Sequence, residues 1–89
     1  EIFKSSLLDN YPNPFNPATS IRYNLSSDNF TTVKVYNIQG KEVSVPVNEF
    51  QKSGFHTVSF NAANLPSGIY YYTVSSGNFI ATKKMILLK

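Results

Sequence analysis

The residues that most often carry out catalysis are few and dispersed in this chain. His56 is the only histidine and cysteine is absent, so a nucleophile–base pair would have to combine His56 with a serine. The five carboxylates are scattered: Glu1, Asp9, Asp28, Glu42 and Glu49. No two of them have a spacing that would present a pair for general acid–base catalysis. The four glycines stand singly, without a phosphate-binding loop. The sequence therefore predicts no catalytic residues and no enzymatic activity.

The same residues have ordinary structural explanations. His56 alternates with Val58 and Phe60, which predicts a hydrogen-bonded histidine at the edge of a core. Asp9-Asn10 and Asp28-Asn29 offer oxygen ligands to Ca²⁺, but such pairs more commonly cap turns through their own side chains. We expect capped turns and no metal site. A chain of 89 residues also has little room beside its core for a sizeable cofactor, and none is expected.

Aromatic side chains are the most abundant groups with binding potential, with seven Phe and six Tyr. In a strand, the run Tyr70-Tyr71-Tyr72 must place at least one ring on each face. Tyr71, together with Tyr36 and Phe55, is a candidate for stacking on sugar rings. Packing between neighbouring strands on an outer sheet face explains these rings equally simply. We favour packing and keep carbohydrate binding as the alternative.

Two segments stand out by their composition. In the segment 11–17, called the strap below, three prolines fix φ and remove backbone donors, and each favours an extended residue before it. Phe15 is the only large apolar side chain between these prolines, so we expect it to anchor the strap at one end of the fold. The segment Lys83–Lys89 is basic, then apolar, then basic. It is either a core strand with solvated lysines or an edge strand that a partner pairs with by β-augmentation.

The elements that must position these residues are predicted to be β-strands, because short alternating runs are bounded by Gly, Pro, Asn and Ser and no helical period is present. The predicted strands are Leu7–Asn10, Ser20–Leu25, Phe30–Asn37, Lys41–Val47, Gly54–Phe60, Ile69–Val74 and Phe79–Leu88. Pro46 makes the fourth an edge candidate, and irregular alternation at Thr82–Lys84 predicts a bulge in the last. This spacing favours an all-β fold, an immunoglobulin-like antiparallel β-sandwich of about seven strands, with a small barrel as the alternative.

Length and charge limit the remaining functions. We expect one domain over residues 1–89, held together without disulfides. The formal charge of +3, with Lys83-Lys84 as the only dense basic pair, is too weak for a nucleic-acid interface. No apolar run is long enough to span a membrane as a helix. The sequence shows no signal-peptide pattern and starts at Glu1, so we expect it to be a piece of a larger protein.

Several ordered segments together resemble the C-terminal sorting domain of type IX secretion cargo, known from Bacteroidetes and related phyla. They are Tyr11–Pro17, Ile21–Tyr23, Val35–Lys41, Gly54–His56, Leu65–Tyr70 and Lys83–Met85. The resemblance extends from Leu8 to Lys89. The chain is also similar to the immunoglobulin-like domain of flagellar hook-capping proteins. Both families include forms with a third proline, as at Pro17, so this residue does not distinguish between them.

The resemblance implies a β-sandwich at the end of a larger secreted protein, which directs a fused N-terminal cargo through an outer-membrane translocon to the cell surface. A surface sortase-like peptidase commonly removes such a domain. Carried over by position, the implied recognition motif is Pro12, Asn13, Pro14, Phe15, Gly68, Tyr70, Lys83, Lys84 and Lys89.

Two other functions remain as alternatives. One is a carbohydrate-binding module of a secreted polysaccharide-degrading enzyme, and the other is a structural immunoglobulin-like spacer. An exposed terminal strand also allows a dimer through an edge strand.

Overall fold

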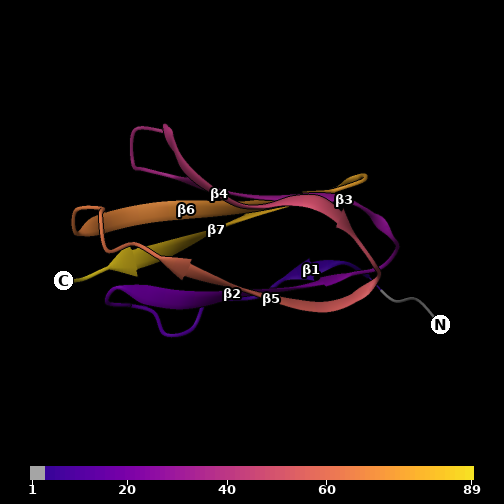
Figure 1. Cartoon of the computed structure of the whole chain (residues 1–89), viewed down its shortest axis with the longest axis horizontal. Helices are drawn as coiled ribbons and strands as arrows, with labels where there is room; N and C mark the ends of the chain where they lie inside the picture. Colours follow the sequence, from indigo (N-terminus) through magenta and orange to yellow (C-terminus); the bar gives the residue numbers. More distant parts are fainter. Residues whose placement is uncertain (1–3) are drawn as a thin grey trace.

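Seven antiparallel strands in two stacked sheets form the computed structural model, which describes residues 4–89 (Figure 1). The strands are β1 (Ser6–Leu7), β2 (Ala18–Leu25), β3 (Asn29–Tyr36), β4 (Glu42–Gln51), β5 (Gly54–Asn61), β6 (Gly68–Ser76) and β7 (Phe79–Leu87). One sheet has the order β1-β2-β5 and the other the order β4-β3-β6-β7. The predicted immunoglobulin-like sandwich is confirmed, rather than the barrel. Glu1 and the first residues of the predicted 1–89 domain lie outside the described residues.

The core lies between the two sheets and follows the predicted alternation. On β2 the odd-numbered side chains Ile21, Tyr23 and Leu25 are fully buried, while the even-numbered ones lie on the outer face. β3 and β6 bury alternate residues in the same way, and β7 buries Met85 and Leu87. Two-residue periodicity therefore sets which side chains face the core.

All seven strands differ by one or more residues from their predicted limits, and β1 and β4 differ most. β1 ends at Leu7 instead of Asn10, since the Leu8 carbonyl turns away to accept a hydrogen bond from Tyr72 of the opposite sheet. β4 continues through Pro46 to Gln51, four residues beyond the predicted end at Val47. Pro46 is tolerated because β4 is an edge strand with register shifts against β3 between Val33 and Tyr36.

The bulge predicted at Thr82–Lys84 is wrong. β7 pairs with β6 without a break from Phe79 to Leu87. The alternation looks irregular in the sequence because Lys83 occupies an inward-facing position, where its ammonium group lies 3.3 Å from the Asp9 carboxylate. No helix among residues 4–89 has the length and apolarity needed to cross a membrane.

Candidate recognition surface

The strap lies along the end of β7 as a short parallel strand. Phe15 N–H donates to the Ile86 carbonyl (2.9 Å), and Leu88 N–H donates to the Phe15 carbonyl (3.0 Å). The Asn13 side-chain oxygen accepts from Ile86 N–H at 3.0 Å. These bonds use the outward-facing backbone groups of β7, so the strap covers the edge of the terminal strand at residues 86–88.

Phe15 anchors the strap, as predicted. Its ring is only 2% exposed and meets Phe60 of β5 edge to face, with ring centroids 6.3 Å apart. The start and end of the strap are also held, because Tyr11 pairs with Ser20 and the Pro17 carbonyl accepts from Ala62 N–H at 2.8 Å. The strap therefore has one fixed path across the end of the sandwich.

Asn10, which the sequence did not single out as part of the site, fixes the entry to the strap. It is 3% exposed, and its amide donates to the Pro12 carbonyl (3.2 Å) and to the Thr19 hydroxyl (3.0 Å). The Thr19 hydroxyl donates to the same Pro12 carbonyl at 2.8 Å. A proline removes a donor but keeps its carbonyl, so two side chains converge on that acceptor.

The β5–β6 loop is held next to the strap by Tyr70 and Gly68. The buried Tyr70 hydroxyl donates to the Pro66 carbonyl (2.6 Å), in the manner of a tyrosine corner. Gly68 has φ of 154° and open space where a side chain would stand, so its backbone conformation explains the glycine. The loop holds the chain end as well, because Lys89 N–H donates to Ser67 Oγ at 3.0 Å.

Replacing Tyr70 with phenylalanine is expected to lower the free energy of unfolding by about 1 kcal/mol, the usual contribution of one hydrogen bond. Urea unfolding monitored by circular dichroism measures this loss. Tyr71→Phe is the matched control, since the Tyr71 hydroxyl has no hydrogen-bond partner among residues 4–89. An equal loss in both variants would show that the tyrosine corner contributes nothing.

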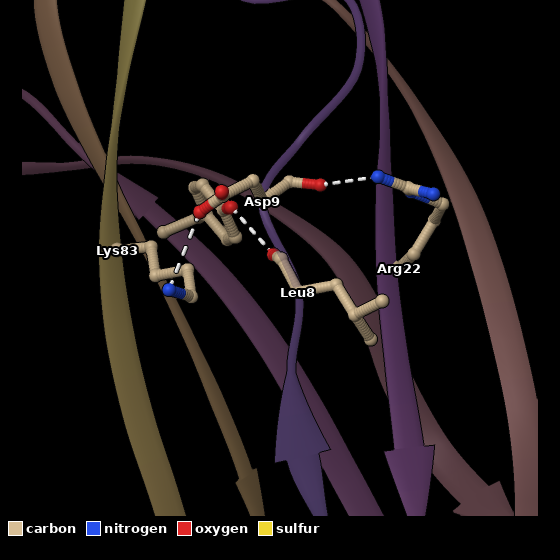
Figure 2. A network of polar contacts seen from close by, with 5 residues as sticks. Leu8, Asp9, Arg22 and Lys83 are labelled. Carbon is tan, nitrogen blue, oxygen red and sulfur yellow. Dashed lines mark hydrogen bonds and ion pairs between the residues drawn. The ribbon is translucent and has the colours of Figure 1, made fainter.

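A three-residue connection, Leu8 to Asn10, ties β1 and the strap to both sheets (Figure 2). The Asp9 carboxylate lies 3.3 Å from Lys83 Nζ of β7, and the Asp9 carbonyl accepts from Arg22 Nη2 of β2 at 2.8 Å. The Leu8 carbonyl accepts from the Tyr72 hydroxyl of β6 at 2.8 Å. Burial raises the pKa of Tyr72 to about 12, so this hydroxyl remains a hydrogen-bond donor at pH values where an exposed tyrosine is already ionised.

Most of the implied recognition motif lies at the end of the sandwich that the strap covers, beside the C-terminal residues (Figure 1). Lys83 and Lys84 lie further along β7, opposite Tyr72 and Tyr71. The members differ in access. Phe15 and Tyr70 are buried, Lys83 is half-buried, and Asn13 and Gly68 are exposed. The exposed side chains with no buried role define a surface called the strap end. It includes Pro12, Pro14, Leu88 and Lys89 at the end of the sandwich and extends along the outer face of β7 to Lys84, two residues before the part of β7 that the strap covers.

A pocket of about 370 Å³ adjoins the strap end and was not predicted from the sequence. It lies between the β3–β4 turn and the β5–β6 loop, and Ile38, Leu65 and Ile69 are among its lining residues. Apart from Val43, its lining residues lie within Val35–Lys41 and Leu65–Tyr70, two segments that carry the resemblance.

The other candidates have structural roles. His56 Nε2 donates to the Lys52 carbonyl at 2.7 Å and its ring stacks on Tyr23, which confirms a hydrogen-bonded histidine at the core edge. Asp28 accepts from Ser53 N–H at 2.8 Å and so caps a turn, whereas Asp9 pairs with Lys83. Between Lys4 and Lys89, no group of three or more His, Asp or Glu residues could hold a metal ion.

The aromatic residues considered for sugar binding lie on two different faces. Tyr36 and Tyr71 are paired neighbours on the outer face of the β4-β3-β6-β7 sheet, and both are half-buried. Phe55 is exposed, but on the outer face of the other sheet. The three rings therefore do not form a single platform.

A comparison with protein families identifies one family whose model covers both the strap and the strands that hold it. The family model described as the secretion system C-terminal sorting domain matches residues 9–88. The match begins at Asp9, so it includes the strap and every strand from β2 to β7. No curated protein and no solved structure gives a match.

Proposed function

Because this chain belongs to the family of secretion system C-terminal sorting domains, we propose that the strap end is the surface that the secretion machinery recognises. Family membership makes the chain a non-catalytic sorting signal of the type IX, or Por, secretion system. It also implies contact with that machinery, a fused cargo, and delivery to the cell surface or outside the cell.

The observation that carries this proposal is the hydrogen bonding between the strap and β7. It joins residues about 70 positions apart in the sequence into one surface. The side chains of Pro12 and Pro14 are exposed on the strap, and those of Lys84, Leu88 and Lys89 on or just after the terminal strand. A surface held by backbone bonds presents these groups without a large ordering cost on binding, which favours affinity.

The strap also affects how a partner could recognise the terminal strand. A partner strand adding to β7 would need the outward-facing backbone groups of residues 86–88, and the strap already uses them. This favours recognition through the exposed side chains of the strap end over strand addition at that point.

The partners that we propose are an outer-membrane translocon, which binds the folded domain, and a surface sortase-like peptidase, which removes it. The whole chain is then one domain at the end of a larger secreted protein that crosses the periplasm and the outer membrane. The segment Lys4–Ser5 contacts Ser26 at the end of the sandwich opposite the strap (Figure 1). A cargo joined on that side leaves the strap end free.

Reversing the charge of Lys84 and Lys89 is expected to reduce the amount of a fused reporter at the cell surface by about tenfold or more, equivalent to about 1.4 kcal/mol of recognition free energy. The reporter carries a signal peptide and precedes the domain, and Lys84→Glu/Lys89→Glu is compared with the intact domain. Both side chains are exposed, so the fold should persist. Truncation is a poorer test, since removing residues 83–89 also removes the fully buried Met85 and Leu87.

Lys4→Glu/Lys52→Glu is the control matched for charge. Both lysines are exposed, Lys52 in the β4–β5 turn and Lys4 at the end of the sandwich opposite the strap. Accumulation of the strap-end variant in the periplasm, with the control exported normally, supports the proposal. Normal export of the strap-end variant, or equal loss in the control, would remove the strap end as the recognised surface.

A further inference from the structure

The outer strands of the two sheets differ in how well their edges are protected against pairing with another chain. β1 is two residues long, and β4 contains Pro46 and two register irregularities. β7 is covered by the strap at residues 86–88 and places Lys83 inward. Short length, proline, bulges and inward charges are the usual ways in which proteins block edge pairing.

β5 has none of these protections. It runs for eight residues, Gly54–Asn61, with no proline, no Lys, Arg, Asp or Glu, and an unbroken register against β2. Within residues 4–89, no strand pairs with its other side. Its outward-facing side chains, Phe55, Thr57 and Ser59, are exposed and uncharged.

The free backbone groups of β5 can be identified from one bond. Ala62 N–H donates to the Pro17 carbonyl, and in an antiparallel ladder the residues that bond to the neighbour alternate. Phe60, Val58 and His56 therefore direct their N–H and C=O groups toward β2. The N–H and C=O groups of Phe55, Thr57 and Ser59 point away from it.

We propose that β5 pairs antiparallel with β5 of a second copy of this chain, joining two three-stranded sheets into one continuous sheet. A strand that pairs with itself about a two-fold axis must be complementary to its own reverse. With Val58 at the axis, Thr57 lies opposite Ser59 of the second copy, and Phe55 opposite Asn61.

Charge and geometry both permit this pairing. Like charges do not meet, because β5 has no charged side chain. The register places the free backbone groups of Thr57 opposite those of Ser59 of the second copy, as an antiparallel ladder requires. The two strap ends point in opposite directions in such a dimer, so the inference does not depend on the role proposed for them.

Sedimentation velocity of the 89-residue chain over a range of concentrations tests the proposal. The expected result is a dimer that Thr57→Lys weakens by about tenfold or more in dissociation constant, while Thr82→Lys on the β7 edge leaves it unchanged. Both threonines are exposed on edge strands, so both variants should fold. A monomer at every concentration, or a dimer weakened by Thr82→Lys or by neither variant, would overturn it.

A second variant tests the position of the two-fold axis by disulfide cross-linking. Since the chain has no native cysteine, an introduced cysteine is the only thiol that can react. Under oxidation, Val58→Cys is expected to give a disulfide-linked dimer, because paired residues about 4.5 Å apart in an antiparallel ladder suit a disulfide. Ile80→Cys on the exposed edge of β7 is the control. Cross-linking through Ile80→Cys alone would place the contact on β7 and contradict the proposal.

Discussion

Replacing Phe15 with alanine is expected to lower the free energy of unfolding by about 3–5 kcal/mol, the usual cost of removing a buried phenyl ring. The ring is 2% exposed and packs against Phe60, so its loss leaves a cavity under the strap. Because small domains are stable by only about 5–15 kcal/mol, this is a large fraction of the total. Urea unfolding of the purified chain measures the change.

Two comparisons make the Phe15 result specific. Phe50→Ala removes a ring that is 60% exposed on β4, and it should change the free energy of unfolding by less than about 1 kcal/mol. In the Phe15 variant, the amides of Ile86 and Leu88 should lose protection from hydrogen exchange before those of β3 and β6 do, since they bond to the strap. Equal destabilisation by the two variants would contradict the anchoring role of Phe15.

Raising the pH from 10 to 12 is expected to destabilise the fold through Tyr72. Burial raises its folded-state pKa to about 12, so the unfolded chain ionises first and stability is lost as the pH rises from 10 toward 12. The difference corresponds to about 3 kcal/mol. Burial also raises the pKa of Tyr23, which adds a loss of the same sign. Chemical unfolding at a series of pH values measures it.

Tyr72→Phe is the control for the alkaline transition. It should be less stable near neutral pH by about 1 kcal/mol, because the Leu8 carbonyl loses its hydrogen-bond donor. Its further loss between pH 10 and 12 should be clearly smaller than that of the intact chain, with Tyr23 supplying what remains. The same alkaline loss in both proteins would exclude Tyr72 as its source.

The fold was predictable from the sequence to the extent that side chains alternate along strands. Ile21, Tyr23 and Leu25 face the core as their spacing predicts. The burial of Phe15 was also predictable, since Phe15 is the only large apolar side chain between the prolines. Strand limits were less predictable. Pro46 correctly predicted an edge strand, but the polar residues after Val47 suggested an early end to β4, which continues to Gln51.

The arrangement of the site was less predictable than its residues. Hydrogen bonds between backbone groups join the strap to β7. Such hydrogen bonds depend on the path of the chain and leave no pattern in the side chains. In the sequence, Lys83 looked like an interruption of the alternation and so suggested a bulge. The Asp9 carboxylate that pairs with its inward-facing ammonium group lies 74 positions earlier, where the local pattern cannot show it. The sequence also could not separate the buried members of the motif, Phe15 and Tyr70, from the exposed lysines.

Site-specific photo-crosslinking during export tests most directly whether the strap end is recognised. A photoreactive amino acid replaces exposed Lys84 in one full-length cargo and exposed Lys52 in another, and each is irradiated in cells that carry the secretion system. The account predicts a covalent product with an outer-membrane component from position 84 and none from position 52. A product from position 52 alone, or none from position 84 while the cargo is still exported, would contradict it.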